Sequence, residues 1–322
     1  MFRPFFPAIA SLALLTALPP ASAQETINFG IIATESSQNL RADWQPILDD
    51  MGKQMGVKIK AFFAPDYAGI IEGMRFNKVQ LAWMGNKSAM EAVDRAGREI
   101  FAQLVNLDGT SGYYSVVSVP KDSPYQNIGE LMKDGKKLNF GIGDPNSTSG
   151  YLVPSYYLFA QNNYDMKTTF KTMRGANHET NVMAVVNKQV DAAVHSSDTL
   201  TRVKERQPEA AAKLRQIWQS PLIAGDPLVW RKDLAPAMKE KVKTFFLNYG
   251  QSGENVNQAK ARLAKLQISM FKESTDAQLN PVRQLELFKE KTKIEADAGV
   301  KPEEKKAKLD ALNRKLADLA KY

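Results

Sequence analysis

The sequence predicts an α/β protein with two units, each a mostly parallel sheet that carries helices on both faces. Short apolar runs rich in β-branched residues alternate with amphipathic runs at the spacing of βαβ units. This alternation fills residues 26–97 and starts again at residue 113, without a strict sequence repeat. The chain of 322 residues is also long enough for two domains.

The first unit shows a regular order of strands and helices. Short apolar runs predict strands at 26–33, 57–64 and 80–85. Amphipathic segments predict helices between and after these strands, at 40–56, 68–79 and 86–97.

The second unit repeats this order with different sequences. Apolar runs predict strands or extended segments at 113–120, 137–143, 190–196, 214–221 and 227–231. Helices are expected at 123–136 (after a turn), 148–163, 179–189 and 197–207. Pro154 lies in the second of these helices, and a proline is tolerated there only near the first turn.

The N-terminal residues have the pattern of a secretory signal peptide, expected to span residues 1–23. Arg3 supplies a positive charge, residues 8–18 form a short apolar core, and residues 21–23 (Ala-Ser-Ala) match a cleavage site. The core is too short for a membrane anchor, so we expect an exported, soluble protein. The sequence has no cysteine, which excludes disulfides, a thiolate metal site, a cysteine nucleophile and a lipid anchor on cysteine.

The formal net charge of +8 is compatible with an ordinary basic secreted protein. Nucleic-acid binding would need clustered basic residues interleaved with aromatic ones. The basic residues instead mix with acidic ones at 288–315, a pattern typical of a solvated helix face. We therefore expect no nucleic-acid partner.

The C-terminal segment at 301–322 predicts a helix with one apolar stripe. Leu309, Leu312, Leu316 and Leu319 recur at spacings of three, four and three residues. The helix either packs on its own domain or pairs between two subunits, and the sequence leaves both interpretations open.

Three adjacent hydroxyl side chains follow the strand expected at 137–143. Ser147, Thr148 and Ser149 stand at the start of a predicted helix. Free backbone N–H groups and the positive end of the helix dipole favour an anion there, and the hydroxyls add neutral donors. The simpler interpretation is an ordinary N-cap. The Asn-Ser-Thr match to a glycosylation site is discounted because so short a match is common by chance.

Ligands of open α/β sheets sit beyond the carboxyl ends of the strands, so side chains that follow strands are the next candidates. Tyr67 and Tyr113 could donate to an oxyanion, although each could also be a packed aromatic residue. His178 stands at a predicted helix start, while His195 in a strand is more typical of a structural residue. Two histidines without cysteine are a weak metal signal, and we expect no metal or cofactor.

Two acidic residues, Asp198 and Asp226, also follow strands. Asp198 could be a helix N-cap, and Asp226 with Pro227 forms a favourable turn. We call residues 147–149 the hydroxyl loop. If both acidic residues face this loop, they would repel a dianion by several kcal/mol, about the value for close charges at low effective dielectric. They would instead favour a ligand with a cation at its other end. One carboxylate could alternatively accept the proton of a monoanionic oxyacid.

Enzyme signatures are missing from the sequence. It contains no G-x-S-x-G elbow, Walker A loop, G-x-G-x-x-G after a strand, or H-E-x-x-H motif. An exported enzyme acting on phosphoesters would need a metal set or an activated nucleophile, and we expect the protein not to be an enzyme.

Several long blocks resemble one family in order along the chain. They are "FFAPDYAGIIEGMRFNKV", "SAMEAVDRA", "GDPNSTSG", "HETN", "SPLIAGDPLVWR" and "PVRQLELFKE". These blocks are similar to those of the periplasmic phosphonate-binding proteins of ABC transporters, and the resemblance covers nearly the whole chain after the signal peptide.

The resemblance implies a two-lobed type II periplasmic binding protein fold, each lobe a mixed sheet flanked by helices, with a C-terminal helical extension. We expect lobe 1 at residues 24–118 and 224–280, lobe 2 at 119–223, and the extension at 281–322. Closure of the two lobes around the ligand would then complete the contacts of each lobe.

The resemblance also implies roles for the candidate residues. The hydroxyl loop would hold phosphonate oxygens, with further donors from Tyr67, Tyr113 and His178. Asp226 would meet an ammonium group. The relatives have Glu at the position of Asp198, so the carboxylate is one methylene shorter here. They have Tyr where this chain has Met84, so this chain lacks a hydroxyl near the cleft.

The function implied is capture of alkylphosphonates, with 2-aminoethylphosphonate favoured, for a membrane permease of an ABC importer. The protein would act in the periplasm, and its C-terminal helix could form a homodimer. The alternatives are a receptor for phosphate, phosphite or a related small oxyanion, and an oligomerising protein that depends on the C-terminal helix.

Overall fold

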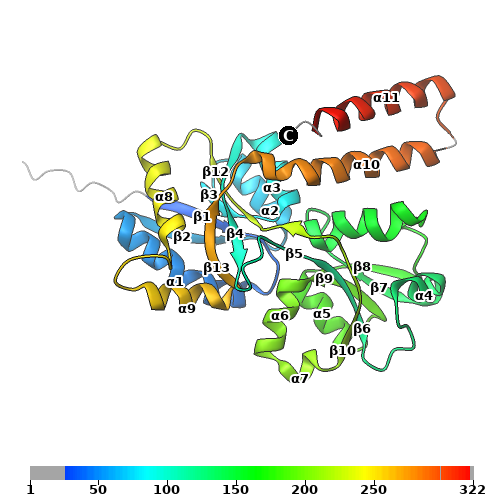
Figure 1. Cartoon of the computed structure of the whole chain (residues 1–322), viewed down its shortest axis with the longest axis horizontal. Coiled ribbons are helices and arrows are strands. Elements are labelled where there is room, and N and C mark those ends of the chain that lie inside the picture. Colours follow the sequence, from blue (N-terminus) through cyan, green and yellow to red (C-terminus); the bar gives the residue numbers. More distant parts are fainter. Residues whose placement is uncertain (1–25, 298, 320–322) are drawn as a thin grey trace, which may run out of the picture.

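The protein consists of two lobes and a helical hairpin (Figure 1). The structure is a computed structural model and describes residues 26–297 and 299–319. The predicted signal peptide, residues 1–23, lies outside the described residues.

Lobe 1 is built on a six-stranded sheet with the order β13-β4-β12-β3-β1-β2. Its strands are β1 (Thr26–Ile31), β2 (Lys58–Phe63), β3 (Leu81–Trp83), β4 (Arg98–Asn106), β12 (Pro227–Arg231) and β13 (Ile268–Glu273). β1 runs parallel to β2 and β3, whereas β12 runs antiparallel to β3 and β4, and β13 antiparallel to β4.

Lobe 2 is built on a five-stranded sheet with the order β10-β6-β9-β7-β8. Its strands are β6 (Ser115–Pro120), β7 (Asn139–Ile142), β8 (Thr172–Gly175), β9 (Ala192–Ser196) and β10 (Leu214–Gln219). β7 is parallel to β8 and β9, but β6 pairs antiparallel with β9 and β10. Both sheets are thus mixed, as the family resemblance implied. The mostly parallel sheets predicted from the βαβ rhythm are wrong, because rhythm does not show which strands become neighbours.

The chain passes between the lobes at a small two-stranded ribbon. There β5 (Gly112–Tyr113) pairs antiparallel with β11 (Ile223–Ala224), so the outgoing and returning crossings lie side by side. The domain limit expected at residue 118 falls within β6, and the limit at residue 223 falls within β11. The domain boundaries stay a prediction.

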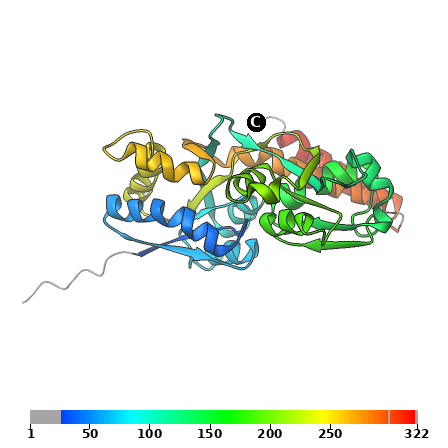
Figure 2. The same ribbon diagram turned by 90° about the horizontal axis from the view of Figure 1, so that it is seen from below.

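Helices flank both sheets, and the two lobes lie next to each other in both views (Figures 1 and 2). Those of lobe 1 are α1 (Ser37–Met55), α2 (Tyr67–Arg75), α3 (Asn86–Ala96), α8 (Pro236–Asn248) and α9 (Val256–Lys265). Those of lobe 2 are α4 (Ile128–Lys133), α5 (His178–Val186), α6 (Ser197–Arg206) and α7 (Pro208–Ala211), with the short turn η1 (Gly135–Lys137).

Each lobe has its own aromatic core. In lobe 1, Phe29 of β1 packs against Trp44 of α1, with ring centroids 5.2 Å apart. In lobe 2, Phe140 of β7 stacks on Phe170 at 4.3 Å. All four side chains are buried. The burial of such large apolar side chains is the main stabilising contribution in a chain without disulfides.

The helix predicted at 148–163 is not a regular α-helix. It forms two π-helical segments, η2 (Thr148–Leu152) and η3 (Ser155–Phe159), and a final turn, η4 (Ala160–Asn162). Pro154 separates the π segments. It has no N–H to donate to the carbonyl of Gly150, four residues earlier. That carbonyl accepts instead from the N–H of Gly143 at 2.8 Å, which draws the hydroxyl loop into a tight turn.

The C-terminal extension is a helical hairpin that leaves lobe 1 and lies beside lobe 2 (Figure 1). The turn η5 (Asp276–Leu279) leads into α10 (Asn280–Ala296), and α11 (Pro302–Leu319) folds back along α10. Leu312 of the predicted stripe is buried, while Leu309, Leu316 and Leu319 are half-buried. The stripe therefore packs at least in part on its own chain.

Candidate ligand-binding site

A small cavity of about 20 Å³ lies between the two lobes. Every residue predicted for the site lines it: Tyr67, Tyr113, Ser147, Thr148, Ser149, His178, Asp198 and Asp226. A volume of this size suits about one water molecule, so the lobes enclose the cavity closely. The structure brings the predicted residues together, and their contact with a ligand stays a prediction.

Several helices begin at this cavity. The first residues of α2 (Tyr67), η2 (Thr148) and α5 (His178) line it, as do the N-cap residues of α3 (Gly85) and α6 (Ser196). Each helix N-terminus carries backbone N–H groups without helical partners and the positive end of a dipole. Their convergence makes the cavity favourable for an anion.

The hydroxyl loop forms one wall of the cavity and is fully buried. Ser147 is the N-cap of η2 and accepts from the N–H of Gly150 at 3.0 Å. The simpler N-cap interpretation is thus correct for Ser147. Thr148 differs, because its Oγ1 accepts from the backbone N–H of Lys87 in lobe 1 at 2.8 Å. Its hydroxyl hydrogen can still donate to a ligand oxygen.

The two tyrosines and His178 add neutral donors. Burial, followed by the nearby negative charge of Asp226, raises the pKa of Tyr67 and of Tyr113 well above their usual values. Burial lowers the pKa of His178 to about 3, so its imidazole is neutral at pH 7. Its Nε2 lies 3.3 Å from Ser147 Oγ. These groups can bind an oxyanion by hydrogen bonds without neutralising it.

The two carboxyl groups make the cavity electrostatically asymmetric. Burial and, after it, the charge of Asp198 raise the pKa of Asp226 to about 8, although a hydrogen bond from Tyr113 opposes this. Burial raises the pKa of Asp198 to about 6, against the lowering effect of Arg202. Both groups therefore favour a proton or a cation in the closed cavity.

Buried polar atoms without hydrogen-bond partners gather at the cavity. Among the residues that the structure describes, they include Thr34 Oγ1, Trp83 Nε1, His178 Nδ1 and Asp226 Oδ1. Such atoms are uncommon in native proteins because an unpaired buried group costs about 1–3 kcal/mol. A polar ligand in the cavity would supply the missing partners.

Sequence reasoning missed Thr34, Trp83 and Arg202, which also line the cavity. Thr34 follows β1, and Trp83 is the last residue of β3. The rule that ligands sit beyond strand ends, applied to every strand, would have found these two. Arg202 lies one helical turn inside α6, where no such signal exists.

Met84 and His195 have structural surroundings. Met84, fully buried, packs in the core of lobe 1 and is not among the residues that line the cavity. His195 Nε2 lies 2.9 Å from Ser118 Oγ, and its Nδ1 lies 3.2 Å from the carbonyl of Ser196. The structural interpretation of His195 is therefore supported.

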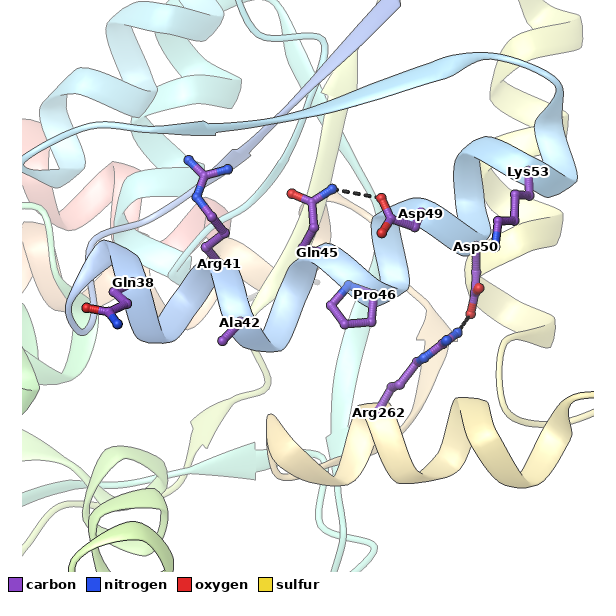
Figure 3. Close-up of a pocket in the computed structure, with 9 residues that line it drawn as sticks. All are labelled: Gln38, Arg41, Ala42, Gln45, Pro46, Asp49, Asp50, Lys53 and Arg262. Carbon is purple, nitrogen blue, oxygen red and sulfur yellow. Dashed lines mark hydrogen bonds and ion pairs between the residues drawn. The ribbon is translucent and has the colours of Figure 1, made fainter.

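A larger hollow of about 410 Å³ lies along the outer side of α1 (Figure 3). Several of its charged and polar side chains are already paired. Asp50 binds Arg262, and Gln45 donates to Asp49 at 2.8 Å. Lobe 2 supplies none of the residues that line it. We therefore do not assign the ligand site to this hollow.

Two kinds of feature are absent from the described residues. No described helix is both long and apolar enough to cross a membrane. Within residues 26–297 and 299–319, no cluster of three or more His, Cys, Asp or Glu side chains could hold a metal ion.

The two mixed sheets, the paired crossings and the cavity enclosed between the lobes define a type II periplasmic binding protein. The chain belongs to the family described as ABC transporter, phosphonate, periplasmic substrate-binding protein, whose model matches residues 29–279. It is a substrate-binding component of an ABC transporter and not an enzyme.

Proteins that are similar to this chain over most of its length support this assignment. The phosphonates-binding periplasmic protein of Escherichia coli strain K12 is 52% identical over 320 residues, 97% of this chain and 93% of that protein. A phosphate-import protein of Mycolicibacterium smegmatis is 30% identical, covering 69% of this chain and 71% of that protein. A solved binding-protein component of an ABC phosphonate transporter from Pseudomonas aeruginosa superposes with a TM-score of 0.89 and 54% identity, covering 93% and 98% of the two chains.

Proposed function

We propose that the protein captures alkylphosphonates that carry an amino group, with 2-aminoethylphosphonate the best candidate. The observation that carries this proposal is the asymmetry of the cavity. Helix N-termini and the hydroxyls of the Ser147–Ser149 loop gather as donors, while Asp198 and Asp226 supply acceptors. A zwitterion of this kind matches both sets.

Binding and closure are coupled in this proposal. Tyr67, Thr34 and Asp226 belong to lobe 1, whereas the hydroxyl loop, His178 and Asp198 belong to lobe 2. Only the closed form completes both sets of contacts, so the ligand shifts the population toward that form. Each hydrogen bond to a charged group contributes about 1.5–3 kcal/mol, which allows Kd values of about nM to μM after association costs.

We further propose the cellular setting. Residues 1–23 would direct export to the periplasm, where the closed form would deliver the ligand to the permease of the transporter. A homodimer through α11 is the least supported of these partners, since Leu312 already packs within its own chain.

Calorimetry with 2-aminoethylphosphonate, ethylphosphonate and phosphate tests the ligand assignment. We expect 2-aminoethylphosphonate to bind more tightly than ethylphosphonate by well over about tenfold, the equivalent of 1.4 kcal/mol or more. Equal binding of these two ligands would contradict a carboxylate–ammonium contact and remove Asp198 and Asp226 from the site.

A receptor for phosphate, phosphite or a related small oxyanion is the second candidate. Similarity to a protein named for phosphate import favours it. A protonated Asp226, whose pKa is raised to about 8, could also donate to an oxyanion. In the same calorimetric series, this candidate predicts that phosphate binds most tightly.

A further inference from the structure

A buried cluster of ion pairs joins the two lobes beside the cavity. Glu35, in the loop after β1 of lobe 1, exposes 1% of its side chain. Its Oε1 pairs with Nε of Arg202, and its Oε2 pairs with Nη1 of Arg206 at 2.7 Å. Both arginines belong to α6 of lobe 2, and Arg206 also pairs with Asp43 of α1. We call these four residues the interlobe ion cluster.

Arg202 would have another partner if Glu35 were absent. It lies four residues after Asp198 on α6, and an acid four residues before a base is the favourable spacing for an ion pair on a helix. Yet among the ion pairs of the described residues, none joins Arg202 to Asp198. The guanidinium binds Glu35 and donates to Thr199 Oγ1 at 3.1 Å instead.

The result is a surplus of acidic over basic side chains at the cavity. Among the described residues no ion pair joins Asp198 or Asp226 to a cation, although Arg202 is close enough to lower the pKa of Asp198, while Glu35 and Asp43 are paired with the arginines. Asp198 accepts from Ser197 Oγ at 3.3 Å, which leaves acceptor capacity for a ligand. Arg202 is the only arginine among the cavity-lining residues, and its guanidinium pairs with Glu35.

We propose that Glu35 is a positioning residue for ligand selectivity: it holds Arg202 away from Asp198 and so leaves the Asp198 carboxylate to a cationic group of the ligand. This inference rests on the proposed function, in which Asp198 meets the ammonium of an aminoalkylphosphonate.

The same arrangement links selectivity to closure. Glu35 and Arg202 belong to different lobes, so their pair forms only when the lobes come together. In an open form Arg202 can pair with Asp198 on its own helix. Closure exchanges this partner for Glu35 and frees the carboxylate at the moment when the ligand becomes enclosed.

The test compares Glu35→Gln with the double variant Glu35→Gln/Arg202→Met. The quantity measured is the ratio of the Kd for ethylphosphonate to the Kd for 2-aminoethylphosphonate, obtained by calorimetry. Glu35→Gln should lower this ratio by about fivefold or more, because the freed Arg202 neutralises Asp198. Removing the guanidinium as well should restore the ratio to within about twofold of the wild-type value.

Asp43→Asn is the matched control. It replaces a carboxylate by an amide in the same cluster, but Asp43 contacts Arg206 and not Arg202. It should weaken the two ligands by the same factor and leave the ratio unchanged.

The outcomes separate this inference from the proposed function. If the wild-type protein binds the two ligands equally, the ammonium contact is wrong and both proposals fall. If the wild type discriminates but Glu35→Gln keeps the full ratio, or if the double variant does not restore it, only the role of Glu35 is overturned.

A less disruptive variant is available if circular dichroism shows that Glu35→Gln does not fold. Glu35→Asp keeps the charge and shortens its reach by one methylene. It should lower the ratio by an intermediate factor, and an unchanged ratio would overturn the proposal.

Discussion

Thr148 takes part in two interactions that coincide in the closed form. It lies at the N-terminus of η2 in the proposed oxyanion site, and its Oγ1 also accepts from the N–H of Lys87 across the interlobe boundary. In the proposed site, a single hydroxyl therefore serves both ligand contact and the contact between the lobes.

Thr148→Val removes this hydroxyl at almost constant volume. We expect a loss of affinity for 2-aminoethylphosphonate of about 100-fold, since one hydrogen bond to a charged group and one buried contact are lost. Thr148→Ser should keep most of the affinity. Thr201→Val is the control, because Thr201 does not line the cavity and its Oγ1 donates to the carbonyl of Ser197 in its own helix. Wild-type affinity in Thr148→Val, measured by calorimetry, would contradict the proposed site.

The raised pKa of Asp226 predicts opposite pH dependences for two ligands. Without ligand, Asp226 has a pKa of about 8 and is largely protonated at pH 7. An ammonium group favours the ionised form, so binding releases protons and affinity for 2-aminoethylphosphonate should rise from about pH 6 to 8. Ethylphosphonate lacks the cation, so its affinity should fall over the same range.

Calorimetry in buffers of different ionisation enthalpy measures this proton release directly. Asp226→Asn removes the group and leaves the titration of the free ligand, so the difference between the proteins isolates Asp226. Parallel pH profiles for the two ligands in the wild-type protein would be incompatible with an ammonium–carboxylate contact.

A site residue could be predicted from the sequence when a local pattern marks it. Hydroxyl and acidic residues directly after strands stand out locally, and the structure places Ser147, Thr148 and Asp226 at one cavity. Arg202 carries no local signal. Its orientation depends on Glu35, 167 residues away in the sequence, and a contact of that kind emerges only from the folded arrangement of the lobes.

At the scale of elements, the hydroxyl loop depends on close approach between two glycines. A Cβ at Gly143 would lie 2.5 Å from the Cα of Gly150, closer than a side chain can be accommodated. The N–H of Gly143 also donates to the carbonyl of Gly150, which Pro154 leaves without its usual helical donor. The shape of the loop is thus determined by the backbone.

Gly143→Ala should distort the loop and weaken binding of 2-aminoethylphosphonate by about tenfold or more, with a loss of about 1–3 kcal/mol in the free energy of unfolding. Gly175→Ala is the matched control, because a Cβ there meets nothing within 4 Å. Calorimetry and urea unfolding measure the two effects. Unchanged affinity in Gly143→Ala would show that loop shape does not matter for binding.

The order of strands and helices was largely accessible from periodicity, as with β1, α1 and β2. Periodicity did not predict the π-helical segments, although Pro154 indicated that the helix would be irregular. A proline predicts that a helix is interrupted, but whether it bends, breaks or widens depends on where the freed carbonyl finds a donor. Here the donor is Gly143, seven residues before Gly150.

At the scale of the whole molecule, contacts between the lobes extend beyond the cavity. Glu179 of α5 accepts from the N–H of Ser36 at 2.9 Å and from Asn39 at 2.7 Å, both in lobe 1. The N–H of Tyr67 donates to Asp144 at 3.2 Å. These contacts stabilise the closed form that the proposed mechanism requires.

The last helix, α11, is separable from this mechanism. Deleting residues 298–322, which include α11, should leave the affinity for 2-aminoethylphosphonate within about twofold, because α11 lines neither the cavity nor the crossings. Light scattering of both proteins shows whether α11 holds a dimer. A large loss of binding on deletion would favour a protein whose function depends on the C-terminal helix.

The two-lobed fold was implied by the family resemblance, and the structure and the comparisons confirm it. Sequence periodicity alone predicted two α/β units but not their mixed sheets. The antiparallel strands β12 and β13 join lobe 1 only after the chain has built lobe 2, and pairing over that distance leaves no local pattern.

A crystal structure grown with 2-aminoethylphosphonate tests the central claim most directly. We predict phosphonate oxygens at hydrogen-bonding distance, about 3 Å, from the hydroxyls of Ser147, Thr148 and Ser149, with the ammonium nitrogen equally close to the carboxylates of Asp198 and Asp226. A ligand bound in the reverse orientation, or outside the cavity between the lobes, would contradict the account.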